Sequence, residues 1–200
     1  TRRSSDLAVI ILNNQFVSET ESDEVFLARV HAWLDLTPGI PFGIYECPIP
    51  YKRLVSIPVL ENLLATDRLC YHKDTSLQID EVAAKIKAGG QQVFGVYDAY
   101  IEHAIESLNA GSKGLSCIQG NYFPELIVDL CKKTKRSQAI QNFMSEHMRL
   151  MHETYPISAK YVLQKMGFPI DLATRRKVGE LSSEMMKKLD ALIEEYRERF

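Results

Sequence analysis

The sequence has 200 residues, of which 46% are hydrophobic and 25% are charged, and its formal net charge is -2. This is the composition of a globular protein with enough apolar residues for a sizeable core. The near-neutral charge argues against nucleic acid or an anionic membrane surface as a partner. No apolar run approaches the roughly 20 residues of a membrane-spanning helix, so no membrane partner is expected.

The first two thirds of the chain alternate continuous apolar runs with amphipathic helical patterns. The run at 6–12 follows a basic start, but it is too short for a signal peptide and lacks a cleavage site, so it predicts a strand. Ser56 is a plausible N-cap, two helices have proline in the first turn, and glycines stop two others. In chain order we expect strand 6–12, helix 23–36, strand 40–45, helix 56–65, strand 68–72, helix 79–90, strand 92–97, helix 99–111, strand 114–120 and helix 124–134.

From Ser137 to the end the pattern contains no further strand. We expect helices at about 137–153, 157–166 and 178–198, with a short turn near 170–176. The last of them has an apolar face and a charged, solvated face. Its apolar face carries Leu181, Met185, Leu189, Leu192 and Ile193.

Four cysteines occur in the chain, and they form neither a C-x-x-C pair nor a metal-binding spacing. They are Cys47, Cys70, Cys117 and Cys131. This usage predicts buried free thiols in a cytoplasmic protein. The sequence also has no phosphate-binding loop, dinucleotide-binding fingerprint or metal cluster, so we expect no cofactor and no metal.

Strands that alternate with helices predict right-handed βαβ units and a parallel sheet covered on both faces. The strand ends recur at similar intervals, which suits a βα-barrel better than an open sheet. An eight-unit barrel needs about 250 residues, however, and only five strands are predicted. The pattern alone leaves two alternatives: an open five-stranded α/β sheet, or a barrel whose first three units lie outside this sequence.

In parallel α/β folds, ligands bind at the carboxyl ends of the strands. Hydrogen-bonding residues follow each of the five predicted strands. They lie at 13–15, 45–46, 73–75, 97–98 and 119–121. The second and third of these groups supply a tyrosine and a lysine.

Lys73, at the end of the third predicted strand, has two interpretations. A lysine attacks a carbonyl when desolvation lowers its pKa and leaves a neutral amine. Schiff-base chemistry also needs proton transfers, for which Tyr45 is the candidate relay. Alternatively, Lys73 is a solvated strand end paired with Asp74, and Tyr45 is a half-buried aromatic. The chemistry of the residues alone favours this second interpretation.

Strand alternation predicts how the side chains around Lys73 are divided. Leu69, Tyr71 and Lys73 are expected on one face, with Cys70 and His72 on the other. His72 is therefore expected to support the site from behind rather than to act in it.

A family resemblance changes the balance between these interpretations. "GIYECPIPYKR" (43–53) followed by "CYHKDTS" (70–76) resembles paired motifs of the dihydrodipicolinate synthase / N-acetylneuraminate lyase family, class I aldolases that act on pyruvate or similar 2-oxo acids. The stretch at 93–130, with "GLSCIQGNYFP", looks like the family's seventh and eighth barrel units. "YPISAKYVLQKMGF" (155–168) resembles its C-terminal helical segment.

The resemblance implies a (β/α)8 TIM barrel of which this chain supplies strands 4–8 plus the C-terminal helices, as the C-terminal portion of a longer protein. Residues 1–136 would form five βα units, and 137–200 the helical segment. By the same resemblance Lys73 is the Schiff-base lysine and Tyr45 the proton relay. Ser116 and Cys117 fall where the eighth strand approaches bound substrate.

The chain also departs from the family's pattern at two positions. The synthase has an arginine two residues after the proline of its Tyr-x-x-Pro motif, but here Pro48 is followed at that distance by Pro50. Lys52 or Arg53 could substitute from a shifted loop. The synthase's strand-four tyrosine is replaced by Asn14, which we expect to line the substrate site. Both departures favour a divergent aldolase over the synthase itself.

Glu46 directly follows Tyr45, where an amide is common in the family. It is expected to bind a substrate hydroxyl or to act as an acid or base; the alternative is a loop carboxylate paired with Lys52 or Arg53.

The predicted function is a lyase that makes or breaks a carbon–carbon bond through a Lys73 Schiff base. Its partners would be a small 2-oxo acid, an aldehyde acceptor and further copies of itself in a dimer or tetramer. A non-catalytic barrel that binds a 2-oxo acid or serves assembly is the main alternative. An independently folding five-stranded protein is the third.

Overall fold

The structure is a computed structural model that describes residues 8–175 and 178–200. Its contacts divide the chain into a first compact unit that ends at Ser116 and a second that begins at Cys117. The predicted boundary after residue 136, which separates barrel units from C-terminal helices, stays a prediction. Residues 6–7 of the first predicted strand and residue 176 of the predicted turn lie outside the described residues.

The first unit is built on a parallel sheet whose strands follow one another in chain order, β1-β2-β3-β4-β5. A sheet that runs in one direction without reversing its order is typical of a βα-barrel, whereas a doubly wound sheet reverses. The elements of this unit are β1 (Val9–Leu12), α1 (Asn13–Phe16), α2 (Asp23–Leu36), β2 (Phe42–Tyr45), α3 (Ile57–Leu64), β3 (Leu69–Asp74), α4 (Ile79–Gly89), β4 (Gly95–Asp98), α5 (Ala104–Ala110) and β5 (Gly114–Leu115).

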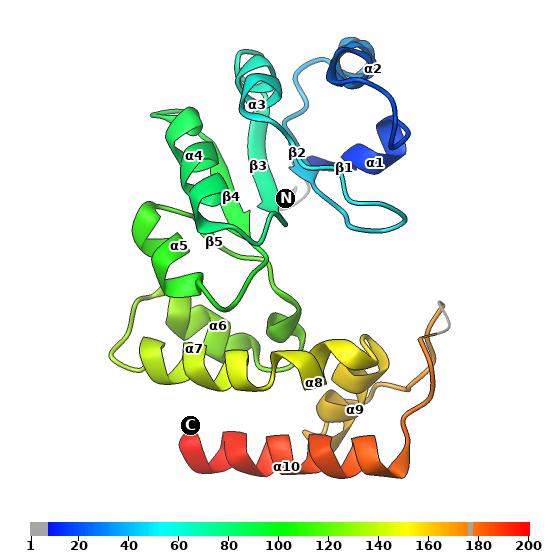
Figure 1. The fold of residues 1–200 in the computed structure, drawn as a ribbon, viewed down its shortest axis with the longest axis vertical. Helices are drawn as coiled ribbons and strands as arrows, with labels where there is room; N and C mark the ends of the chain where they lie inside the picture. Colours follow the sequence, from blue (N-terminus) through cyan, green and yellow to red (C-terminus); the bar gives the residue numbers. More distant parts are fainter. Residues whose placement is uncertain (1–7, 176–177) are drawn as a thin grey trace, which may run out of the picture. The chain divides into compact units, whose positions relative to one another are not determined.

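The core of the first unit lies between the sheet and its helices. Figure 1 shows α2, α3 and α4 following one another around the outside of the strands. Burial of aliphatic and aromatic side chains there stabilises the unit, because each removes apolar surface from water. The fully or nearly fully buried members include Ile11, Phe26, Val30, Phe42, Ile44, Val59, Leu60, Leu63, Leu69, Val82 and Val96.

The pairing of β2 with β3 contains an irregularity that reorients one side chain. Phe42 pairs with Leu69, but the next residue, Gly43, pairs with Tyr71. The extra residue makes a bulge, which changes the alternation of side chains between the two faces. Leu69 therefore packs in the hydrophobic cluster with Phe42, and the prediction that it shares a face with Tyr71 and Lys73 was wrong.

The second unit consists of helices: η1 (Ile118–Asn121), α6 (Pro124–Cys131), α7 (Ser137–Glu146), α8 (Met148–Glu153), α9 (Ile157–Lys165) and α10 (Ser183–Arg199). The predicted strand 114–120 ends at Leu115, and a short 3-10 helix takes up its second half. The predicted helix 137–153 is interrupted at His147. The last helix begins later than predicted, after Ser182, whose Oγ accepts the backbone N–H of Met185 at 3.1 Å.

Two expectations about the environment of the chain can be compared with the described residues. All four cysteines are free, as predicted, but only Cys117 is buried, and Cys131 is exposed. The expectation of uniformly buried thiols was therefore wrong. Over 8–175 and 178–200, no helix combines the length and the apolar character that crossing a membrane requires.

Gly43 tests the close packing of the strands at the bulge. A Cβ at this position would lie 2.5 Å from Ile10 Cδ1 and 2.8 Å from Tyr71 Cβ. We expect Gly43→Ala to lower the free energy of unfolding by about 1–3 kcal/mol, because overpacking forces the strands apart. Urea denaturation measures this. Gly120→Ala is the control, since its Cβ would meet only Ile127 at 3.7 Å, and an equal loss in both variants would contradict the account.

Candidate active site

Tyr45 and Lys73 lie side by side at the carboxyl ends of β2 and β3. The two residues are register partners in the parallel ladder. The side-chain nitrogen of Lys73 lies over the tyrosine ring, 4.3 Å from its centroid. Tyr97 of β4 is the register partner of Lys73 on its other side. The predicted nucleophile and the predicted relay are therefore brought together by the sheet itself.

The same face of the sheet carries further aromatic and hydroxyl groups. The rings of Tyr71 and Tyr97 stack, with centroids 4.5 Å apart, and the Tyr71 hydroxyl donates to Ser116 Oγ at 3.4 Å. Burial raises the pKa of Tyr71 above its ordinary value, so its hydroxyl keeps its proton at neutral pH. Gly114 leaves room for the Tyr97 ring, which a Cβ there would approach to 3.1 Å.

The two residues expected at the fifth strand belong to different compact units. Ser116 ends the first unit and is tied to β4, because its backbone N–H donates to the carbonyl of Asp98 at 2.7 Å. Cys117 begins the second unit and is buried. Contact of either residue with substrate stays a prediction.

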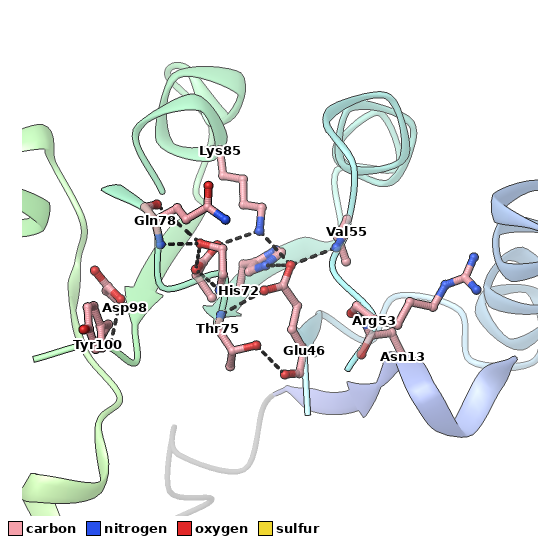
Figure 2. Close-up of polar contacts among 12 residues, drawn as sticks. Asn13, Glu46, Arg53, Val55, His72, Thr75, Gln78, Lys85, Asp98 and Tyr100 are labelled. Carbon is pink, nitrogen blue, oxygen red and sulfur yellow. Dashed lines mark hydrogen bonds and ion pairs between the residues drawn. The ribbon is translucent and has the colours of Figure 1, made fainter. Parts of the chain in front are cut away.

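The opposite face of β2 and β3 holds four fully buried polar side chains, which we call the charge cluster: Glu46, His72, Asp74 and Lys85. Lys85 reaches in from α4, as Figure 2 shows. Its ammonium nitrogen lies 2.7 Å from Glu46 Oε1 and 2.5 Å from Asp74 Oδ2. His72 Nε2 lies 3.1 Å from Glu46 Oε1.

Glu46 is fully engaged within this cluster and the neighbouring backbone. Its Oε1 accepts the backbone N–H of Val55 at 2.8 Å, and its Oε2 accepts that of Thr75 at 2.9 Å. Because the side chain is buried on the face opposite Lys73, the expected contact with substrate does not fit its position. The alternative pairing with Lys52 or Arg53 was also wrong, since its cationic partner is Lys85.

The charges of the cluster stabilise each other. Burial alone would raise the pKa of Glu46, but the neighbouring His72 and the charge of Lys85 lower it to about 2. Burial would lower the pKa of Lys85, and the charges of Glu46 and Asp74 outweigh that and raise it. The carboxylate and the ammonium are thus both charged at neutral pH, as a buried ion pair requires to offset its desolvation.

Ligand atoms of Glu46, His72 and Asp74 lie close enough together to surround a metal ion. The Lys85 ammonium, however, contacts both carboxylates directly. A cation adjacent to the two carboxylates repels a metal ion and already offsets part of the negative charge that would attract one. The arrangement therefore fits an ion-pair network better than a metal centre.

Asn14 supports the loop that follows Tyr45 instead of lining a pocket. Its side chain is buried, and Nδ2 faces the carbonyls of Cys47, Ile49 and Tyr51 at 2.7, 2.9 and 2.9 Å. The Tyr51 hydroxyl donates back to the Asn14 carbonyl at 2.9 Å. The expectation that Asn14 contacts substrate does not fit an amide group used in this way.

Arg53 does not replace the synthase's arginine in this structure. Its guanidinium donates to the carbonyl of Glu21 and to the carboxylate of Asp23, both at 2.7 Å. Lys52, by contrast, is exposed. The side chain of Arg53 is thus already bound by α2 and by the segment before it.

Comparison with known proteins agrees with the motifs and the sheet order. The model of the dihydrodipicolinate synthetase family matches residues 35–196. The chain belongs to this family. A 4-hydroxy-tetrahydrodipicolinate synthase from Fervidobacterium nodosum is 30% identical over 112 residues, which are 50% of this chain and 38% of that protein.

Solved structures show the same fold at low identity. The YagE prophage protein of E. coli K12, a dihydrodipicolinic acid synthase family member solved with pyruvate, is 16% identical with a TM-score of 0.82, covering 96% of this chain and 66% of that one. The dihydrodipicolinate synthase of Thermotoga maritima is 19% identical with a TM-score of 0.77, covering 94% and 66%. The chain thus spans less than two thirds of these relatives, and its predicted fold class, part of a (β/α)8 barrel, is confirmed.

Some features of this family member were missed from its sequence. The partner of Glu46 was one of them, although a signal existed: Lys85 lies three residues after the buried Val82, on the apolar side of α4. A lysine on the buried stripe of a helix requires a buried counter-charge. The strand-end carboxylates of β2 and β3 were the candidates to supply it.

The acid stability of the protein should reveal the state of Glu46. Its pKa falls from 4.5 to about 2 on folding, so its contribution is complete above about pH 4.5 and is lost as the pH falls through about 2. That difference corresponds to roughly 3 kcal/mol. Glu46→Gln should therefore be less stable than the wild type near neutral pH and should lose less stability on acidification.

Urea titrations between about pH 5 and pH 2 measure this difference. Glu81→Gln, which changes an exposed carboxylate at the start of α4, should keep the wild-type dependence. Equal acid sensitivity of Glu46→Gln and the wild type would contradict the buried ion pair.

The loop at 47–53 should depend on Asn14. Asn14→Ala removes the donor shared by three carbonyls, so we expect a loss of about 2 kcal/mol and faster proteolytic cleavage within the loop. Gln15→Ala is the matched control, because the Gln15 side chain donates to Asn14 Oδ1, at 3.3 Å, and among the described residues it has no hydrogen bond to a carbonyl of the loop. Limited proteolysis with mass mapping measures the effect, and an unchanged loop in Asn14→Ala would refute it.

Proposed function

We propose that this chain carries the nucleophile of a class I aldolase-type lyase. In this proposal Lys73 forms a Schiff base with pyruvate or a similar 2-oxo acid, and Tyr45 relays protons. The observation that supports it most directly is the register pairing of the two residues, with the Lys73 side-chain nitrogen 4.3 Å from the ring centroid of Tyr45. Membership of the dihydrodipicolinate synthetase family supports the same reaction class.

The proposed chemistry follows from an amine next to a phenol. The neutral amine of Lys73 attacks the C2 carbonyl, and the carbonyl oxygen leaves as water once it is protonated. Tyr45 delivers and removes protons in these steps. The protonated imine then withdraws electrons from C3, which loses a proton to give an enamine. C3 of the enamine attacks the aldehyde carbon while the aldehyde oxygen takes up a proton, and cleavage of the carbon–carbon bond is the reverse of these steps. Water finally hydrolyses the imine and frees the Lys73 amine. The reaction uses no metal.

The proposed partners are the 2-oxo acid and an aldehyde acceptor. Because Pro50 stands where the synthase has its carboxylate-binding arginine and Arg53 is bound to Asp23, we propose an acceptor other than the synthase's own. The expected cytoplasmic location and homo-oligomer stay predictions.

For the oligomer, one structurally similar protein is a monomeric dihydrodipicolinate synthase variant. It is 18% identical with a TM-score of 0.78, and the match covers 95% of this chain and 64% of that one.

A non-catalytic relative remains the second candidate function. It is favoured by one observation: Asn14 supports a loop through its amide, where the synthase has a relay tyrosine. Such a protein would bind 2-oxo acids without forming a covalent bond. Stabilisation against heat by pyruvate, with no adduct at any lysine, would distinguish it.

Borohydride trapping of the full-length protein tests the proposal. With pyruvate and other 2-oxo acids, we expect one reduced adduct per chain, located at Lys73 by peptide mapping. Lys73→Arg should form none, and Tyr45→Phe should form it roughly 10²-fold to 10⁴-fold more slowly, the range for lost proton transfer. Lys87→Met, which removes an exposed lysine of α4, should behave as the wild type. No adduct at Lys73 with any of several 2-oxo acids would refute the proposal.

A further inference from the structure

The charge cluster lies on the face of β2 and β3 opposite the proposed catalytic pair, Tyr45 and Lys73. Glu46 is the residue after Tyr45, and Asp74 is the residue after Lys73. Successive side chains of a strand point to opposite faces. Each member of the catalytic pair is therefore followed immediately by a carboxylate on the other face, and the Lys85 ammonium contacts both carboxylates.

We propose that Lys85 is a positioning residue for Tyr45 and Lys73. By joining the two carboxylates, its ammonium holds the carboxyl ends of β2 and β3 in the register that sets the ring of Tyr45 against the amine of Lys73. This inference rests on the proposed function of that pair. It assigns Lys85 no contact with substrate.

Each carboxylate has one oxygen on Lys85 and the other on the backbone just after β3. Glu46 Oε2 accepts the N–H of Thr75 at 2.9 Å, and Asp74 Oδ1 accepts the N–H and hydroxyl of Ser76 at 2.7 and 2.6 Å. Figure 2 shows Glu46 and Thr75 lying beneath Lys85, with the bond between them as a dashed line. The ammonium thus completes a connected set of bonds rather than an isolated pair.

The backbone of residue 46 takes part in the same connection. Its N–H donates to the carbonyl of Lys73 at 3.3 Å, and its carbonyl accepts the hydroxyl of Thr75 at 2.7 Å. These bonds, with those of its carboxylate, link the residue after Tyr45 to both neighbours of Asp74. Movement of Glu46 would therefore move Tyr45 relative to Lys73.

Positioning is the effect expected of such a cluster. A buried ion pair contributes little net stability compared with apolar packing, and its best-supported value is that it selects one arrangement. Misplacement of a reacting group by about 1 Å can cost roughly 10²-fold in rate. The four side chains of the charge cluster are 0% exposed to solvent, on the face of the strand ends opposite the catalytic pair. A cluster in this position is suited to prevent such misplacement.

The test compares three variants of the full-length protein. Lys85→Met removes the ammonium but keeps an unbranched side chain. Glu46→Gln keeps an oxygen acceptor and leaves the Lys85–Asp74 pair balanced, so it carries the test if Lys85→Met does not fold. Val82→Ala is the matched control, because Val82 is a buried α4 residue with no part in the cluster.

Two measurements are made on each variant. The first is the single-turnover rate of borohydride-trapped adduct formation at saturating pyruvate. The second is amide hydrogen exchange in peptides covering 44–47 and 72–76. We expect Lys85→Met and Glu46→Gln to slow adduct formation at least tenfold and to speed exchange in both peptides. Val82→Ala should keep the rate of adduct formation within twofold of the wild type, even if its melting temperature falls as much as those of Lys85→Met and Glu46→Gln.

The outcomes separate this inference from the proposed function. Wild-type rate and exchange in folded Lys85→Met and Glu46→Gln would overturn the inference alone, and so would an equal slowing by Val82→Ala. If the wild type forms no adduct, the proposed function fails. Hydrogen exchange then decides the positioning role: faster exchange at both strand ends in the cluster variants, relative to Val82→Ala, supports it, and unchanged exchange overturns it.

Discussion

The arrangement of the first unit depends on one buried ammonium between two buried carboxylates. Lys85, Glu46 and Asp74 are each 0% exposed, and any of them left alone would be strongly disfavoured in the interior. Because the three come from α4, the end of β2 and the end of β3, satisfying one charge fixes all three elements. The lowered pKa of Glu46 and the raised pKa of Lys85 have this common cause.

Because successive side chains of a strand point to opposite faces, the two faces of the sheet carry different kinds of residues. The face that packs against the helices, which we call the outer face, holds the charged residues out of contact with water. The inner face is left to Tyr45, Lys73 and the stacked pair Tyr71 and Tyr97. The proposed chemistry uses only the inner face. Tyr45 and Lys73, which are expected to react, therefore lie on the opposite side of the strands from Lys85, which is proposed to position them. The loop after Tyr45 is held separately, by Asn14.

Much of this could be predicted from sequence because the information is local. The helix at 23–36 begins and ends where its apolar periodicity does, and the strand–helix alternation predicts a parallel sheet. The pairing of Tyr45 with Lys73 required the family's motif order, since the chemistry of the residues alone favoured a solvated lysine. Family comparison was thus needed to choose between two physically reasonable interpretations.

Other features depend on contacts between segments far apart in the chain. The bulge that moves Leu69 into the core reflects the fit of β2 against β3, which no single strand encodes. The partner of Glu46 is 39 residues away in the sequence. Asn14 likewise acts on a loop more than thirty positions later. The side chains of Glu46 and Asn14 were predicted near substrate because the sequence shows that both follow strand ends. It does not show which distant residues surround them in the fold.

A crystal structure of the full-length protein soaked with pyruvate tests the central claim most directly. The account predicts continuous electron density between the side-chain nitrogen of Lys73 and C2 of the pyruvate, with the Tyr45 hydroxyl in hydrogen-bonding reach and Lys85 still between Glu46 and Asp74. Pyruvate bound without a bond to Lys73, or bonded to a different lysine, would contradict it.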